Sequence, residues 1–225
     1  MTAVSLVIFG GRGAGLLAAD TARRQAEAGV PVEVAGFLND LEPTGSAIGD
    51  LPVLGPFEHW RALPPETRFV APIHKVGQME RRIARIRALS VPARRWFFVA
   101  DPLAVVGQGC RVGANLYLGP HSVVKSMTTI GDHVSVRDGA SIGHDVDVGD
   151  FAFIGTNATV GGYCRLGHGA YVGLAAVIRE HVTVGAMATV GMGAVVVDDV
   201  MPGETVVGNP ARPLPPGGRP GDEPA

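Results

Sequence analysis

A histidine and a carboxylate stand side by side in the stretch Gly143-His144-Asp145-Val146. A neutral imidazole can take a proton from an attacking hydroxyl or amine, and an adjacent carboxylate can fix its tautomer or raise its basicity. His144 and Asp145 are therefore candidates for a general base and its partner. The alternative interpretation is a polar pair on an exposed turn that has no chemical role.

A glycine-rich turn near the N-terminus is a second stretch with chemical potential. The apolar run Ala3–Phe9 predicts a buried parallel strand, Gly10–Gly15 a turn, and the residues from Leu16 to about Ala28 a helix. Free N–H groups at the start of a helix attract anions. A dinucleotide fingerprint is disfavoured, because Leu16 stands where the third glycine is required. Two interpretations of this turn stay open: it binds a nucleotide diphosphate, or it is a tight strand-to-helix turn without a ligand.

The rest of the N-terminal segment also predicts an α/β unit. The second strand, Val32–Leu38, ends in Asn39 and Asp40, and an acidic residue at a strand's carboxyl end can accept a hydrogen bond from a ribose or a base. The remaining expected elements are strands at Leu51–Leu54 and Phe69–Ile73 and an amphipathic helix at Gln78–Leu89, and Trp96–Val99 is expected to close the unit. The arginines between Arg81 and Arg95 are expected on a solvated helix face and the loop after it; contact with a phosphate or a coenzyme is the alternative.

The elements that position His144 follow from a period of six. An aliphatic residue occupies every sixth position from Val106 to Val196, and Gly follows it in twelve of sixteen cases. No helix has this period, whereas a parallel β-helix makes one short strand and one corner from each hexad. Three hexads make one coil, so the column neighbours of His144 are Ser126 and Gly162. His144 then follows a corner glycine and points away from the axis of the prism.

The column pattern also bears on the cysteines and histidines. Cys110 and Cys164 fall in one column three coils apart. At ~4.8 Å per coil they are about 14 Å apart, beyond the ~7 Å limit for a disulfide. We expect both to be buried thiols in a reducing compartment. No two histidines of the repeat have a short ligand spacing, so no metal site is expected.

Composition limits the remaining possibilities. The chain has 225 residues and a net charge of −2. This charge does not indicate a surface that binds polyanions, so we expect no nucleic-acid partner. The first apolar run is too short for a signal or a membrane span, so we expect no membrane association and a cytoplasmic location. Three segments are expected: an α/β domain over 1–100, a β-helix over 101–212, and a disordered Pro- and Gly-rich tail over 213–225.

Four stretches resemble the bacterial sugar acyltransferases of the sialic-acid O-acetyltransferase and nucleotide-aminosugar N-acetyltransferase type. They are Gly10–Gly15, Gly36–Asp40, Gly139–Phe151 and Val207–Arg212. The resemblance implies a Rossmann-like α/β domain that binds a nucleotide sugar, followed by a left-handed parallel β-helix. It implies acetyl-CoA as the acyl donor and a homotrimer with its active site at the subunit interface. It also implies that His144 is the general base and that Asp145 is its partner.

The resemblance further assigns residues to the two ligands. The implied coenzyme contacts are Phe153, Leu174 and Met192. The implied nucleotide-sugar contacts are Arg12, Gly13, Ala14, Asn39 and Asp40. The chain has Ala14 and Phe153 where the family usually has His, and Arg137 where it usually has Asn. A cation at Arg137 favours an acceptor with a carboxylate or a phosphate. Phe153 replaces a polar coenzyme contact, so an acyl donor larger than acetyl is an open alternative.

Three functions are consistent with this sequence. The first is acetyl transfer from acetyl-CoA to the amino group of a nucleotide-linked sugar, which needs little beyond proximity and one base. The second is acylation of a hydroxyl, on a sugar or on another acceptor. The third is a trimeric nucleotide-sugar-binding scaffold that has lost the reaction; His144 and Asp145 argue against it, and the altered Ala14, Arg137 and Phe153 argue for it.

Overall fold

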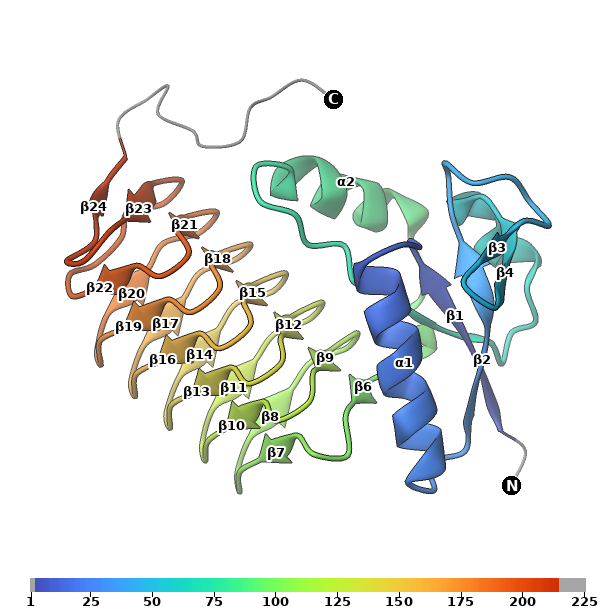
Figure 1. Cartoon of the computed structure of the whole chain (residues 1–225), viewed down its shortest axis with the longest axis horizontal. Helices are drawn as coiled ribbons and strands as arrows, with labels where there is room; N and C mark the ends of the chain where they lie inside the picture. Colours follow the sequence, from blue (N-terminus) through green and yellow to red (C-terminus); the bar gives the residue numbers. More distant parts are fainter. Residues whose placement is uncertain (1–2, 215–225) are drawn as a thin grey trace.

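The computed structural model describes residues 3–214, and these residues form an α/β domain followed by a three-sided β-helix (Figure 1). The domain's sheet has the order β3-β4-β2-β1-β5. Its strands are β1 (Val4–Phe9), β2 (Val32–Leu38), β3 (Ala47–Ile48), β4 (Leu51–Gly55) and β5 (Arg68–Val70). All pairs are parallel except β3 with β4, so the domain is an α/β unit with one antiparallel edge.

Alternating side chains of β1 cover both faces of this sheet. Leu6 and Ile8 share a buried cluster with the apolar residues of α1 (Ala14–Glu27), whereas Val7 and Phe9 share one with α2 (Met79–Leu89). Each helix therefore covers one face, as period-two burial requires. Two short 3-10 helices, Phe57–Ala62 and Ala93–Arg95, complete the domain. Neither α-helix within residues 3–214 has the length and apolar character needed to cross a bilayer.

The end of the domain differs from the sequence expectation. Trp96–Val99 does not belong to the α/β unit as a whole: Trp96 makes an isolated bridge with Phe69, whereas Val99 belongs to β6 (Val99–Ala100), which pairs with the β-helix. The reason is that the first coil offers unpaired backbone groups, and Val99 N–H donates to Leu116 O at 3.0 Å. Arg95 is also not solvated, because its guanidinium donates to the carbonyls of Thr67 and Pro64.

Three parallel sheets form the β-helix. The first contains β7 (Val105–Val106), β10 (Val123–Val124), β13 (Ser141–Ile142), β16 (Thr159–Val160), β19 (Val177–Ile178) and β22 (Val195–Val196). The second contains β8 (Arg111–Val112), β11 (Thr129–Ile130), β14 (Asp147–Val148), β17 (Arg165–Leu166) and β20 (Thr183–Val184). The third contains β6, β9 (Tyr117–Leu118), β12 (Ser135–Val136), β15 (Phe153–Ile154), β18 (Tyr171–Val172), β21 (Thr189–Val190), β23 (Thr205–Val207) and the antiparallel β24 (Arg212–Pro213).

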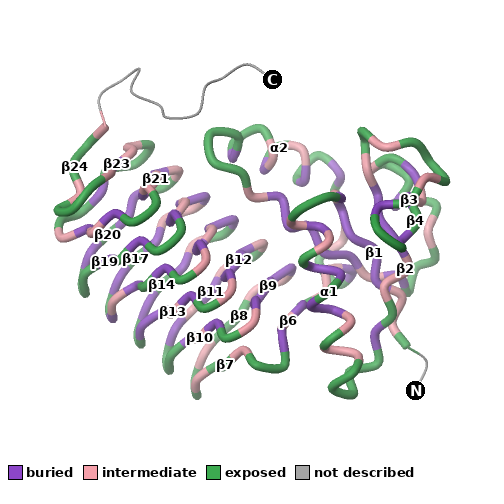
Figure 2. Tube along the Cα trace, viewed as in Figure 1, coloured by how far each residue is buried: buried purple, intermediate pink, exposed green. Residues whose placement is uncertain are grey.

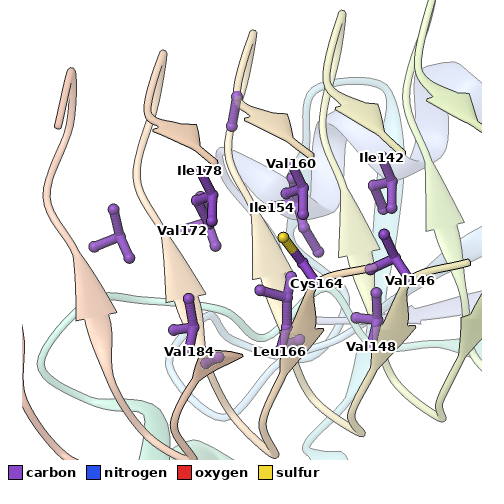
Figure 3. Close-up of a cluster of buried hydrophobic side chains, with 14 of the residues drawn as sticks. Ile142, Val146, Val148, Ile154, Val160, Cys164, Leu166, Val172, Ile178 and Val184 are labelled. Carbon is purple, nitrogen blue, oxygen red and sulfur yellow. The ribbon is translucent and has the colours of Figure 1, made fainter. Parts of the chain in front are cut away.

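The register predicted from the hexad period is confirmed. Val106 pairs with Val124 and Val124 with Ile142, so each coil repeats after three hexads. The paired aliphatic side chains from the three sheets point into the prism and fill its interior (Figure 3). Buried positions recur in every coil along the trace (Figure 2). Corner glycines allow the coils to stack closely: a Cβ on Gly143 would lie 2.6 Å from the backbone nitrogen of Gly162.

The corner segments between successive strands stack into three edges that separate the sheets. The first edge contains residues 143–146, the second 149–152 and the third 155–158. The corner residue two positions before a new strand often has a left-handed backbone. Asp145, for example, lies two residues before β14 and has φ 56°. Asn, Asp and His are enriched in this region, which gives His121, His133 and His181 a backbone reason for their positions.

The two ends of the β-helix differ. Within residues 3–214 no strand pairs beneath β7 and β8, and Val105, Val106 and Val112 stay 55%, 44% and 43% exposed. For the same reason the expectation that Cys110 is buried was wrong: it is half-buried, whereas Cys164 is buried, and both are free thiols. At the other end β24 pairs with β23. Pro213, which was expected in the disordered tail, therefore lies in a strand. Most of the expected disordered tail, residues 215–225, lies outside the described residues.

The α/β domain is fixed onto the second edge of the β-helix (Figure 1). Phe151 and Met187 pack in the same cluster as Ile83 of α2, which lies across successive coils. The buried Asn115 accepts from the Ala71 backbone at 2.9 Å. Near β6, Arg24 of α1 donates to Asp101 at 2.6 Å. These contacts fix where the glycine-rich turn lies relative to the coils.

Candidate functional site

His144 and Asp145 form a hydrogen-bonded pair on the first edge. The His144 Nδ1 lies 2.8 Å from Asp145 Oδ2, and the two side chains are 51% and 41% exposed. With the carboxylate on Nδ1, the Nε2 atom is the one left for an external proton. The structure thus gives the two residues the contact that their sequence positions suggested, on an edge that the α/β domain leaves uncovered.

The neighbouring coil determines how the imidazole is held. A Cβ on Gly162 would lie 3.1 Å from His144 Cε1 and Nε2, so the ring lies against the one residue type that leaves it room. The Tyr163 ring contacts His144 edge-on at 5.0 Å and stacks on His181 at 4.8 Å. The predicted column neighbour Gly162 is confirmed, and Tyr163 is a contact that the sequence interpretation missed.

Four predicted site residues line one cavity of about 220 Å³ between the α/β domain and the third edge. They are Ala14, Arg137, Phe153 and Leu174. The sequence interpretation missed the other four lining residues, Pro72, His74, Ser135 and Thr156. Ser135 had a signal, because it precedes Val136 in the outward-facing strand position, whereas nothing marked His74 before the domain was placed.

The electrostatics of this cavity come from Arg137 and His74. Arg137 is 9% exposed, with its guanidinium 4.9 Å from the centre of the Tyr117 ring. Burial, together with the nearby charge of Arg137, lowers the pKa of His74 from 6.5 to about 3. His74 is therefore neutral at physiological pH, and its Nε2 is enclosed without a hydrogen-bond partner among the described residues.

The glycine-rich turn brings the start of α1 to the same cavity. α1 begins at Ala14, two residues earlier than predicted, because Gly13 adopts φ 70° as its N-cap and no side chain caps it. Its first amide groups carry the positive end of the helix dipole. Arg12 does not line the cavity; its side chain is 72% exposed and pairs with Glu42 at 3.2 Å.

Asn39 and Asp40 have structural partners inside the domain. The Asn39 amide donates to Gly10 O at 3.0 Å and accepts from the backbone of Leu41 and Glu42. Asp40 accepts from the Phe57 backbone at 2.8 Å and pairs with Arg85 at 2.8 Å. These contacts hold the turn in shape, and a direct role in nucleotide binding stays a prediction for both residues.

Leu174 and Met192 continue the third edge above the cavity. They occupy equivalent positions in successive coils and are 47% and 78% exposed. Phe153 lies below them, stacked on Tyr171 at a centroid distance of 4.5 Å. An apolar strip therefore runs along the coils from the cavity, and its residues are the three that the resemblance assigned to the coenzyme.

His144 and the interdomain cavity belong to different edges of one chain. The cavity's lining comes from the third sheet, the third edge and the α/β domain, and does not include His144. A second cavity, of about 380 Å³, lies beside the first edge and is lined by Asp145, Tyr163 and His181 together with Asp147, Arg165 and Thr183. Within residues 3–214 no three His, Cys, Asp or Glu side chains are grouped to hold a metal ion.

Known proteins share both the repeat and the architecture. Residues 127–162, which include His144, match the family model of the bacterial transferase hexapeptide with six repeats. WeeI from Acinetobacter baumannii AYE is 26% identical with a TM-score of 0.79, over 93% of this chain and 99% of that one. The acetyltransferase domain of PglB from Neisseria gonorrhoeae FA1090, solved with acetyl coenzyme A, is 28% identical with a TM-score of 0.57, over 94% and 100%.

A third structure agrees at the level of the fold. A variant of perosamine N-acetyltransferase from Caulobacter crescentus, solved with CoA and GDP-perosamine, is 23% identical with a TM-score of 0.82, over 94% of this chain and 97% of that one. No curated protein sequence matches the chain. The predicted fold class, a Rossmann-like α/β domain before a left-handed parallel β-helix, is confirmed. By its repeat and its architecture together the chain is similar to hexapeptide-repeat acetyltransferases, and this similarity supports an acyl-CoA-dependent acetyltransferase.

Proposed function

We propose that the protein transfers an acetyl group from acetyl-CoA to the amino group of a nucleotide-linked amino sugar. The PglB domain carries acetyl coenzyme A and the Caulobacter enzyme carries CoA with GDP-perosamine, which supports the same donor and the same class of acceptor here. The observation that carries the proposal is the His144–Asp145 pair on an open edge, where the half-exposed imidazole forms its one side-chain hydrogen bond among residues 3–214 through Nδ1.

The pair supplies the proton transfer that such a reaction needs. Acetyl-CoA supplies the acetyl group as a thioester, whose C–S bond breaks as the new C–N bond forms. Asp145 accepts a hydrogen bond from Nδ1 of His144, so Nε2 holds the lone pair. Nε2 takes the proton that the attacking amine loses and passes it to the departing sulfur. General-base help of this kind contributes ~10²–10⁴-fold to the rate.

The apolar strip that runs from the third sheet along the third edge fits the donor. Phe153, Leu174 and Met192 present hydrophobic surface in successive coils, and Leu174 and Met192 are exposed although they are apolar. Burial of such side chains under the arm of a coenzyme would remove this surface from water. Arg12, Gly13 and Ala14 lie at the uncapped start of α1, where the phosphates of a nucleotide sugar are favoured.

A homotrimer would unite the two separated halves of the site. One chain holds the acceptor residues beside its third edge and His144 on its first edge. A cyclic assembly repeats one contact between unlike surfaces, so the first edge of one copy can face the third edge of the next. We therefore place the complete site at the subunit interface.

Ligand-dependent thermal stability tests the proposal first. Acetyl-CoA, CoA and UDP-, GDP- and dTDP-linked amino sugars are added to the wild-type protein and to His144→Ala. A ligand at a hundred times its Kd stabilises the native state by about 2.7 kcal/mol. Acetyl transfer by the wild type with one of these sugars, and its loss in the variant, is the expected result. Product mapping distinguishes amine from hydroxyl acylation, and no response to any CoA species would contradict the donor assignment.

Mixing two inactive variants tests the shared site. His144→Ala and Arg137→Glu are unfolded and refolded together in equal amounts. If each site takes His144 from one copy and Arg137 from the next, random assembly restores about a quarter of the wild-type activity. If both residues act within one chain, the mixture stays inactive. Light scattering on the same sample measures whether the assembly is a trimer.

A further inference from the structure

The interdomain cavity contains a cation that has no counterion among residues 3–214. Arg137 is 9% exposed and forms no hydrogen bond or ion pair through its guanidinium with any residue from 3 to 214. Among these residues Tyr117 is the one whose aromatic ring the guanidinium contacts. No Asp or Glu is among the residues that line the cavity. A desolvated cation without an opposite charge is costly, so the cavity is built for an anion that comes from outside the protein.

Two further polar groups in the lining are unsatisfied. Ser135 is 1% exposed, and its Oγ has no partner among the described residues. The enclosed His74 Nε2 has none either. Buried hydroxyl and imidazole groups are nearly always hydrogen-bonded in folded proteins. Ser135 and His74 therefore offer hydrogen bonds to the same occupant, and Ala14 adds the start of α1, which has no side-chain cap, to the cavity wall.

The size and the remaining walls limit what the occupant can be. The cavity of about 220 Å³ is smaller than the ~300–1,000 Å³ of pockets that enclose a whole drug-sized ligand. Phe153, Leu174 and Pro72 form apolar walls. The site thus fits one end of a larger molecule, with an apolar ring face against Phe153 and an oxyanion at Arg137.

We propose that this cavity is an oxyanion subsite for the acetyl acceptor, with Arg137 as its specificity-determining residue and Ser135 and His74 as hydrogen-bonding partners. The proposal rests on the function proposed above. The oxyanion is a carboxylate on the sugar ring or the diphosphate that joins the sugar to its nucleoside. Both suit a guanidinium, which binds planar or tetrahedral oxyanions through two parallel N–H donors.

The test uses probes that separate these two sources. Titration calorimetry measures binding of UDP-glucuronate and UDP-glucose, which differ only in the carboxylate at C6. Free glucuronate, free glucose and inorganic pyrophosphate repeat the comparison without a nucleoside. The proteins are the wild type, Arg137→Gln, which keeps polarity without charge, and Arg137→Lys, which keeps charge without the bidentate fork.

A ring carboxylate predicts that Arg137→Gln weakens UDP-glucuronate and glucuronate about 10–100-fold and leaves UDP-glucose unchanged. A diphosphate predicts an equal loss for both UDP-sugars and for pyrophosphate. Under either source Arg137→Lys keeps part of the affinity. The proposal is overturned if every anionic probe binds wild type and Arg137→Gln equally, or if none binds the folded wild type. Circular dichroism confirms that each variant is folded.

The outcome is separable from that of the proposed reaction. Cleavage of acetyl-CoA is measured on the same wild-type sample with the best-binding amino sugar. Anion binding that depends on Arg137 without acetyl transfer would keep the subsite and contradict the reaction. Acetyl transfer without any effect of Arg137 on anion binding would keep the reaction and contradict the subsite.

Discussion

The first and second edges of the β-helix have the same stacked corners but different surroundings. On the second edge, His133 stacks on Phe151 at 4.5 Å and lies beneath the α/β domain, and its burial lowers its pKa to about 4. On the first edge, His144 is 51% exposed and bonded to a carboxylate. One histidine is a structural contact and the other is available for chemistry. What covers an edge, rather than the coil itself, decides which role its side chains take.

Replacement of each histidine by alanine tests most directly whether the two histidines have different roles. His144→Ala should lower kcat by ~10²–10⁴-fold and change the free energy of unfolding by less than ~0.5 kcal/mol, because the side chain is half exposed. His133→Ala should do the reverse, with kcat per folded molecule kept and stability reduced by a few kcal/mol, since a stacked ring is lost. Urea unfolding with steady-state kinetics measures both; equal kinetic losses in the two variants would contradict the contrast.

Phe151→Ala tests the covered edge. Phe151 is 4% exposed and packs between His133 and the α2 cluster. Its removal should cost ~3–5 kcal/mol of stability and loosen the α/β domain from the coils. Tyr163→Ala is the matched control on the open edge: Tyr163 is 50% exposed, so its stability loss should be much smaller. Comparable losses would mean that the two edges are equally packed.

Acid should weaken the covered edge before the open one. The pKa of His133 is lowered to about 4 and that of His74 to about 3, so the unfolded chain binds protons first. Stability should therefore be fully present above pH ~6.5 and fall as pH drops from there through 4 to 3, by ~1–3 kcal/mol for His133. His133→Gln should flatten part of this dependence in denaturation curves taken across the pH range. A stability that rises on acidification would refute the assignment.

The smallest expected effect comes from the residue that packs against the His144 ring on the open edge. Gly162→Ala adds a Cβ 3.1 Å from the His144 ring, and the backbone at Gly162 tolerates alanine. The imidazole must turn away, so kcat should fall ~10-fold with stability nearly unchanged. Gly161→Ala is the control, because its Cβ would lie 2.5 Å from the Glu180 backbone and should destabilise the coil instead. A stable Gly161→Ala protein with reduced kcat would argue against this division.

The sequence was enough to predict the β-helix and the place of His144 in it. A strict period of six leaves one register, and the observed pairs Val106 with Val124 and Val124 with Ile142 follow it. It was not enough to predict which edge the domain covers. That choice depends on one side chain per coil, such as Phe151, meeting the apolar stripe of α2, and no local pattern records such a contact.

The site was predicted in part for similar reasons. Arg137, Phe153 and Leu174 meet in one cavity, whereas Asn39 and Asp40 use their polar atoms to hold a loop. A polar residue after a strand can bond to a ligand or to its own turn, and only the folded loop shows which. His74 became visible as a site residue only once its Nε2 was found enclosed without a partner.

The stacking register has a consequence for how this chain can vary in length. From β6 to β22 each strand of the β-helix pairs with the one a full coil away, at a separation of 18 residues. Duplication of one complete coil would lengthen the prism and return every later side chain to its own edge. Insertion of a single hexad would instead turn everything beyond it by one face, and would carry Leu174 and Met192 away from the edge that holds the cavity. Inherited changes in length that preserve catalysis should therefore come in whole coils.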